Sequence, residues 1–164
     1  MVRIAIVEDD AATMRLLQDY VRRHERQYGQ QISVTAFADG EEIAENYRPV
    51  FDIIFLDIEM PHMDGMAAAE HIRTLDKNVI LIFITNMAQF AIKGYAVDAM
   101  DFVLKPVPYF AFSQQLQKAI GRVKKHAQAF IGIPAEGGVH RMDVGEIYYI
   151  ESEGHKLHLY AESG

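Results

Sequence analysis

The sequence contains no cysteine, and this absence excludes several kinds of chemistry at once. Disulfide bonds, thiolate metal sites and cysteine nucleophiles all require a residue that the chain does not have. Long hydrophobic runs are missing as well, since no apolar stretch reaches the ~20 residues that a membrane-spanning helix needs. At the N-terminus a short apolar stretch runs directly into acids, where a signal peptide needs a longer apolar core and a cleavage site. We therefore expect a cytoplasmic protein with no membrane partner.

Positive charge is also scarce. The chain has 16 lysines and arginines against 23 acids, which gives a formal net charge of -7. This balance argues against binding of nucleic acid over the whole surface, but it leaves room for a local nucleic-acid-reading surface. A length of 164 residues, half of them hydrophobic, indicates one full globular domain with part of a second.

Short apolar runs rich in β-branched residues recur along the first three quarters of the chain. They do not alternate with polar residues, which is typical of strands buried on both faces of a parallel sheet. The runs cover residues 2–7, 32–37, 51–56 and 79–84, and a shorter fifth run ends at Leu104. Helical patterns separate or follow them at residues 11–28, 41–47, 66–75, 88–95 and 110–126. The alternation predicts an α/β domain over residues 1–125, a doubly wound, five-stranded parallel sheet with helices on both faces.

The pattern changes in residues 126–164. Glycine-rich turns there separate short strand-like pieces at residues 130–133, 139–142, 147–150 and 156–160. This partial all-β segment is too short to bury a core alone, so we expect a linker and the N-terminal fragment of a second domain. From residue 127 onward it carries two basic residues, Arg141 and Lys156, against six acids, and so lacks the basic footprint of a DNA-binding surface.

Reactive side chains follow the ends of the predicted strands. The carboxyl ends of parallel strands meet at one edge of the sheet, where ligands of open α/β sheets bind. Clustered acids repel each other unless a cation lies among them, and oxygen ligands without histidine or cysteine suit Mg²⁺. The residues concerned are Glu8 and Asp9, Asp57, Thr85, and Lys105.

This set of residues indicates phosphoryl chemistry. A carboxylate can attack phosphorus, and phosphoryl transfer mainly requires positioning and neutralisation of the phosphoryl oxygens. Asp57 is the candidate nucleophile, with Glu8 and Asp9 as metal ligands. Lys105 and the Thr85 hydroxyl are the candidate contacts to the phosphoryl oxygens.

The same positions carry a family resemblance. With "LDIEMPHMDG" around Asp57 and "DFVLKP" around Lys105, the chain resembles the flavodoxin-like receiver domain of two-component response regulators. The resemblance implies that a histidine kinase donates a phosphoryl group to Asp57, and that the backbone carbonyl of Glu59 completes the Mg²⁺ site. The protein is then a phosphoacceptor with at most self-catalysed phosphorylation and dephosphorylation, not an enzyme acting on other molecules.

The resemblance also implies a switch. The peptide bond between Lys105 and Pro106 is expected to be cis and to aim the lysine. Thr85 and Phe102 are expected to form the switch pair, in which the hydroxyl moves to the phosphoryl group and the ring turns inward. The rearranged face is expected to pair with a second copy, so phosphorylation is expected to favour a homodimer.

The tail has a resemblance of its own. The stretch "IYYIESEGHKLHLY" is similar to the opening of a LytTR-type DNA-binding domain, a β-rich module found behind receivers. In that family a loop histidine of the type of His155 reaches into the major groove, and Lys156 beside it is placed to contact phosphate. The two resemblances together imply a transcription regulator whose DNA binding is switched by phosphorylation.

Other interpretations of these residues stay open. Asp57 could be a simple turn residue at a strand end, Asp10 an N-cap of the first helix, and Phe102 plain core. An Mg²⁺-dependent phosphohydrolase of the haloacid dehalogenase kind also uses a strand-end aspartate and a lysine. Such an enzyme places a second aspartate two residues after the nucleophile, where this chain has Glu59. A receiver used only as a docking module is a third possibility.

Overall fold

A computed structural model describes residues 1–45, 47–86, 96–128, 130–135, 138–143, 147–154 and 156–161. Five parallel strands form one sheet in the order β2-β1-β3-β4-β5. Their bounds are β1 Val2–Val7, β2 Ile32–Phe37, β3 Ile53–Leu56, β4 Ile80–Thr85 and β5 Asp101–Leu104. The predicted doubly wound sheet is confirmed.

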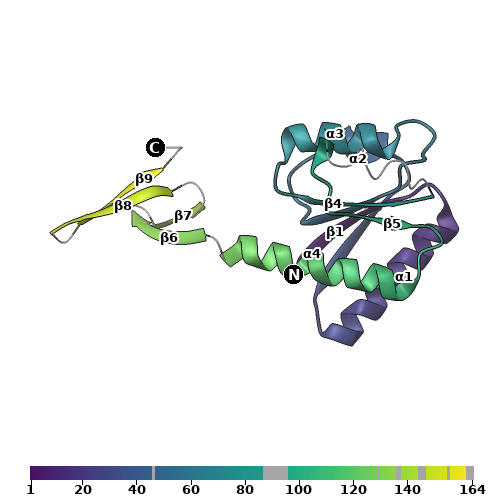
Figure 1. Cartoon of the computed structure of the whole chain (residues 1–164), viewed down its shortest axis with the longest axis horizontal. Helices are drawn as coiled ribbons and strands as arrows, with labels where there is room; N and C mark the ends of the chain where they lie inside the picture. Colours follow the sequence, from purple (N-terminus) through teal and green to yellow (C-terminus); the bar gives the residue numbers. More distant parts are fainter. Residues whose placement is uncertain are drawn as a thin grey trace. The chain divides into compact units, whose positions relative to one another are not determined.

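Within the described residues, four helices cover the sheet. They are α1 Ala11–Tyr28, α2 Gly40–Ala44, α3 Gly65–Leu75 and α4 Tyr109–Gln128. Helices α2 and α3 lie on one face and α1 and α4 on the other (Figure 1). The helix predicted at residues 88–95 lies outside the described residues. None of the helices in the described ranges is long and apolar enough to cross a membrane.

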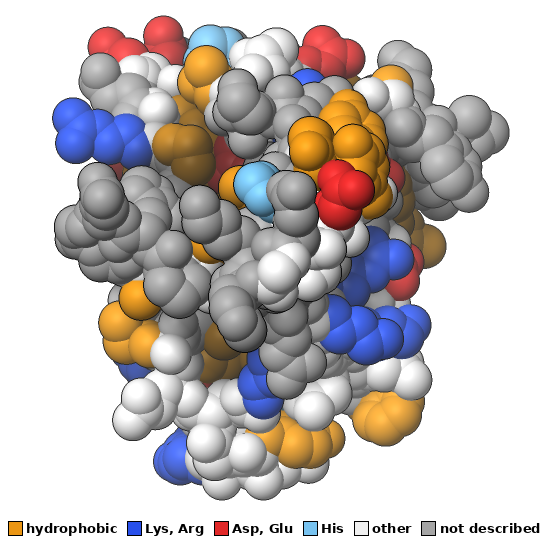
Figure 2. All heavy atoms as spheres, turned by 90° about the vertical axis from the view of Figure 1, so that its left-hand side faces the viewer, with side chains coloured by type: hydrophobic (Ala, Val, Ile, Leu, Met, Phe, Trp, Pro, Cys, Tyr) orange, Lys and Arg blue, Asp and Glu red, His pale blue; other side chains and the backbone are white. Residues whose placement is uncertain are grey.

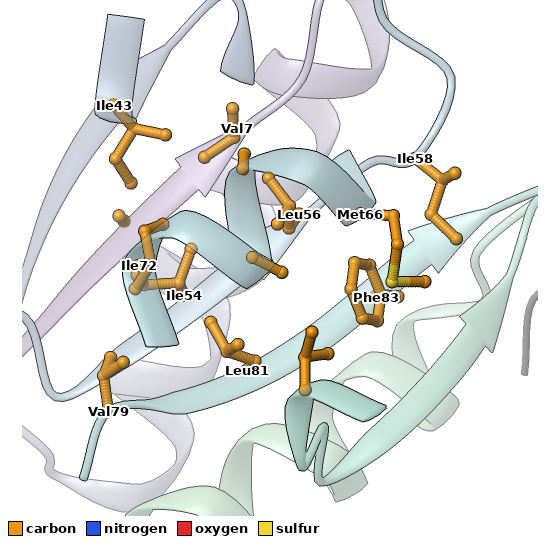
Figure 3. Close-up of a cluster of buried hydrophobic side chains, with 14 of the residues drawn as sticks. Val7, Ile43, Ile54, Leu56, Ile58, Met66, Ile72, Val79, Leu81 and Phe83 are labelled. Carbon is orange, nitrogen blue, oxygen red and sulfur yellow. The ribbon is translucent and has the colours of Figure 1, made fainter. Parts of the chain in front are cut away.

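The central strand β3 shows why the apolar runs do not alternate. Successive side chains of a strand point to opposite faces, so a strand covered by helices on both faces must be apolar throughout. Ile54 and Leu56 pack with α2 and α3, where Figure 3 shows them among Ile43, Met66 and Ile72. Phe55 belongs to the other face, and its ring centroid lies 4.8 Å from that of Phe112 in α4.

Some predicted bounds were wrong by one to three residues. Strand β3 begins at Ile53 and not at residue 51, because the Asp52 side chain accepts a hydrogen bond from the backbone N–H of Arg3. Helix α2 ends at Ala44, before residue 47. Helix α1 starts where predicted, and the Asp10 carboxylate caps it by accepting hydrogen bonds from the backbone N–H and the hydroxyl of Thr13, both at 2.7 Å.

The chain divides into two compact units, Met1–Ile120 and Gly121–Gly164. In the second unit, β6 Phe130–Ala135 pairs with β7 Gly138–Asp143, and β8 Ile147–Glu153 pairs with β9 Lys156–Ala161, both antiparallel. The predicted strands of the tail are therefore present. Tyr148, Tyr149 and Ile150 of β8 are all more than half exposed, which agrees with a segment too short to form a core. The face drawn in Figure 2 likewise has hydrophobic side chains among charged ones at its surface.

Gly65 brings the start of α3 against the end of β3. Its N–H donates a hydrogen bond to the carbonyl of Ile58 at 3.0 Å, and a Cβ at this position would overlap the carbonyl oxygen of Asp57. A backbone carbonyl cannot move aside without moving the loop between β3 and α3. Gly65 is therefore required by close packing on the backbone that carries Asp57.

We predict that Gly65→Ala lowers the free energy of unfolding by about 1–3 kcal/mol, the usual cost of overpacking. Gly121→Ala is the matched control, because Gly121 lies inside α4 with no atom within 4 Å of an added Cβ. That substitution should raise the stability by about 0.5–1 kcal/mol through helix propensity. Urea unfolding followed by circular dichroism measures both. Equal effects of the two substitutions would contradict the close packing at Gly65.

Candidate functional site

The carboxyl ends of four strands bring the predicted residues together. Glu8 and Asp9 follow β1, Asp57 follows β3, Thr85 ends β4 and Lys105 follows β5. Glu8, Asp57 and Thr85 are buried, with 2%, 3% and 0% of their surface exposed, whereas Asp9 is exposed. Because β1 neighbours β3 while the chain order runs from β1 to β2, the acids flank the point where the strand order reverses.

Lys105 joins the two buried acids. Its Nζ lies 2.6 Å from Oδ2 of Asp57 and 2.8 Å from Oε2 of Glu8. The lysine backbone is fixed by the sheet, since its N–H donates to the carbonyl of Thr85 at 3.0 Å. The Lys105–Pro106 peptide bond is cis, as the resemblance implied. The side chain therefore reaches from the edge strand β5 across to the end of β1.

The two oxygens of the Asp57 carboxylate have different surroundings. Oδ1 accepts hydrogen bonds from the backbone N–H groups of Ile58 at 2.7 Å and Glu59 at 3.2 Å. Oδ2 faces Lys105. Backbone donors cannot rotate away as side chains can, so the two N–H groups fix the plane of the Asp57 carboxylate. Oδ2 is then the oxygen that remains directed at Lys105.

Burial and pairing set the protonation of this cluster. Burial raises the pKa of Glu8, and this effect exceeds the opposing hydrogen bond from Lys105. For Lys105 burial is the largest single effect and lowers the pKa, but the hydrogen bonds to Asp57 and Glu8 and the attraction to their negative charges together outweigh it, so the pKa is raised. The lysine is thus firmly charged, while a single positive charge does not fully offset the burial of Glu8.

The carboxylates of Glu8, Asp9 and Asp57 are suited to bind a hard cation. One carboxylate oxygen from each of Glu8, Asp9 and Asp57 lies within 4.8 Å of the other two. An all-oxygen donor set of this charge suits Mg²⁺ and other hard divalent ions. The raised pKa of Glu8 supports the fit, because a further positive charge beside it would favour its ionised form. The Glu59 side chain is exposed, and its N–H is the group that contacts Asp57.

The predicted switch residues lie on β4 and β5. Thr85 is fully buried at the end of β4, paired in register with Leu104. Phe102 is half-buried and stacks on Phe83, with ring centroids 4.9 Å apart and planes 26° apart. In this conformation Phe102 already contributes to the core next to β4.

The residues predicted to contact DNA are only partly within the structure. His155 lies outside the described residues. Lys156 begins β9, where it pairs in register with Glu153 of β8.

Asp39 is not among the predicted site residues, yet it holds the loop after Asp57. Its carboxylate accepts hydrogen bonds from the backbone N–H groups of Glu41 at 2.9 Å, His62 at 3.1 Å and Met63 at 3.2 Å, and it pairs with the His62 ring. One side chain thus caps α2 and ties the β3–α3 loop to it. The Asp-Gly pair before a predicted helix is a signal for the cap, but not for the bond to a loop 23 residues away.

Comparison with known proteins identifies the family. Residues 4–120 match the family described as the response regulator receiver domain, and the chain belongs to this family. The sensory transduction protein LytT of Enterococcus faecalis is 26% identical over 97% of this chain and 69% of its own length. The receiver domain of HemR from Leptospira biflexa superposes with a TM-score of 0.64 at 28% identity, covering 73% of this chain and 94% of that one.

A further solved structure shares the fold alone. The response regulator TrrA from Thermotoga maritima, in complex with Mg²⁺-BeF, has a TM-score of 0.63 at 23% identity and covers 73% of this chain and 99% of its own. The receiver fold expected from the sequence is thereby confirmed.

We predict that Asp39→Ala lowers the free energy of unfolding by about 1–2 kcal/mol at pH 7, because it removes a cap and leaves loop amides unpaired. Burial alone would raise the pKa of Asp39, but its hydrogen bonds from Glu41, His62 and Met63 lower it below the ordinary 3.8. The stabilisation is therefore present above pH 3.8 and is lost as the pH falls through the lower folded-state pKa. Urea unfolding at several pH values measures the difference from the native chain.

Asp19→Ala is the control for this substitution, because Asp19 forms an ion pair with Arg22 in which both side chains are more than two-thirds exposed. Such pairs contribute at most about 1 kcal/mol. If Asp39→Ala has no larger effect than this control at pH 7, the loop attachment is not what stabilises the site.

Proposed function

We propose that the protein is a two-component response regulator whose Asp57 accepts a phosphoryl group from a histidine kinase. The observation that carries this proposal is the contact of Lys105 Nζ with both Asp57 and Glu8 at the carboxyl edge of the sheet. This contact places the candidate nucleophile, Asp57, and the positive charge of Lys105 within hydrogen-bonding distance of each other. Membership of the receiver family supports the same reaction.

In the proposed step, Oδ2 of Asp57 forms a bond to phosphorus while the phosphorus–nitrogen bond of the kinase phosphohistidine breaks. The imidazole leaves with the electron pair of that bond. Lys105 transfers its contact from Oδ2 to an oxygen of the arriving phosphoryl group, and the Thr85 hydroxyl contacts another. Positioning and charge neutralisation of this kind supply most of the catalysis in phosphoryl transfer.

The acids supply the metal site of the proposal. Glu8, Asp9, Asp57 and the backbone carbonyl of Glu59 would hold Mg²⁺, which neutralises charge on the phosphoryl oxygens when bound. The Mg²⁺-BeF complex of TrrA supports this assignment at the level of the shared fold. The protein then acts as a phosphoacceptor, with at most self-catalysed transfer to and from Asp57.

The switch and output complete the proposal. Thr85, Phe102 and Pro106 lie on or directly after β4 and β5, so a shift at the phosphoryl group is transmitted to that edge of the sheet. The altered edge favours a homodimer, and the segment 126–164 is the start of a LytTR-type DNA-binding domain with His155 and Lys156 as DNA contacts. The similarity to LytT, which extends over nearly the whole chain, supports this continuation beyond the receiver domain at 1–125.

We predict that acetyl phosphate and a magnesium salt add one phosphoryl group to the chain, and that Asp57→Asn abolishes the addition because an amide does not attack phosphorus. Asp52→Asn is the matched control, since Asp52 lies at the opposite end of the same strand and pairs with Arg3. Intact-protein mass spectrometry detects the added group. A label that persists in Asp57→Asn would refute the assignment, and rapid turnover of a generic phosphatase substrate would favour the phosphohydrolase instead.

We predict that Asp9→Asn weakens Mg²⁺ binding at least about tenfold, since even residues outside the first coordination shell change metal affinity by that factor. Asp10→Asn serves as the control, because Asp10 bonds to Thr13 and asparagine keeps a helix cap. Isothermal titration calorimetry with MgCl₂ measures both. Unchanged affinity in Asp9→Asn would remove Asp9 from the proposed ligands.

A further inference from the structure

Helix α1 contacts the loop that carries Lys105. The hydroxyl of Tyr20 in α1 donates a hydrogen bond to the backbone carbonyl of Val107 at 3.0 Å. Val107 is buried and lies two residues after Lys105, between β5 and α4. This bond joins two parts of the chain that are 87 residues apart.

The Tyr20 ring is placed independently of its hydroxyl. It packs edge-on against Tyr109 with centroids 5.3 Å apart, and in a tilted arrangement against Phe112 with centroids 5.7 Å apart. Phe112 is itself fully buried against Phe55 of the central strand. Because aromatic packing holds the ring, the hydroxyl can be removed without displacing the side chain that carries it.

The loop with Lys105 is therefore held at two points. On the sheet side, the Lys105 N–H bonds to the carbonyl of Thr85; on the helix side, the Val107 carbonyl bonds to Tyr20. Helix α1 begins directly after the acids, with Asp10 as its cap, and Tyr20 lies about 15 Å further along it at 1.5 Å per residue. The same helix thus fixes the acidic pair at its N-terminus and the lysine loop near its middle.

We propose that Tyr20 is a positioning residue for phosphoryl transfer, which holds the Val107 carbonyl so that Lys105 Nζ reaches the phosphoryl oxygens. This inference rests on the proposed function, because it assigns a role toward that reaction. Tyr20 itself touches no reacting atom. It acts on the lysine through the two intervening residues of the backbone, and its hydroxyl decides how firmly that backbone is held.

The test is the rate of phosphorylation of the full chain by acetyl phosphate at saturating Mg²⁺. Tyr20→Phe should lower the maximal rate about three- to tenfold, the range expected for loss of a neutral hydrogen bond that positions a reacting group. The concentration of Mg²⁺ at half-maximal rate should not change, since the acids are untouched. Tyr109→Phe is the matched control: it removes the hydroxyl that bonds to Gln27 of α1 at 2.7 Å, leaves the Lys105 loop alone, and should keep the native rate.

A double-mutant cycle separates positioning from general destabilisation. In a Lys105→Ala background Tyr20→Phe should have no further effect, because Tyr20 acts only through the lysine. A native rate in Tyr20→Phe, or the same fold-loss with and without Lys105, would overturn the inference. Either outcome leaves the proposed function standing as long as the native chain is phosphorylated on Asp57. Failure of the native chain to accept phosphate would overturn both.

Discussion

The pairing of Lys105 with Asp57 and Glu8 is the interaction on which the rest of the site depends. Two carboxylates are buried at the ends of adjacent strands, and an ammonium group within 3 Å of both offsets part of the cost of burying their charge. Lys105 reaches them from the end of β5, across β4. The order of the sheet and the length of one side chain together explain why these three residues, distant in sequence, form one site.

The fold could be predicted from the sequence because the three central strands β1, β3 and β4 are buried almost throughout, whereas the edge strand β2 is partly exposed. Buried strands need continuous apolar runs, and these stand out against the helical periods between them. The predicted start of β3 is wrong because a polar side chain replaces a sheet hydrogen bond there. Asp52 bonds to the N–H of Arg3 with its carboxylate, so the strand starts one residue after it although Phe51 is apolar. The residue types in a run do not reveal that a side chain takes the place of a backbone hydrogen bond.

The proximity of the candidate site residues could also be predicted, because parallel strands bring their carboxyl ends together whatever the loops between them do. The contacts of Asp39 and Tyr20 could not be predicted from the sequence. Each acts on the backbone of a distant loop, the first on the N–H groups of His62 and Met63, the second on the carbonyl of Val107. Every residue offers these backbone groups, so the partner's identity carries no signal, and only the folded chain shows which are within reach.

The unequal surroundings of the two Asp57 oxygens have a stereochemical consequence. With Oδ1 held by two backbone amides, the two carboxylate oxygens are not equivalent, and in the proposed transfer the attack on phosphorus starts from Oδ2. In that proposal a donor presents its phosphoryl group to Oδ2, the oxygen without a backbone partner among the described residues. The peptide groups of Ile58 and Glu59 thereby select the oxygen that a phosphodonor meets in the proposed transfer, whether the donor is a small molecule or a protein.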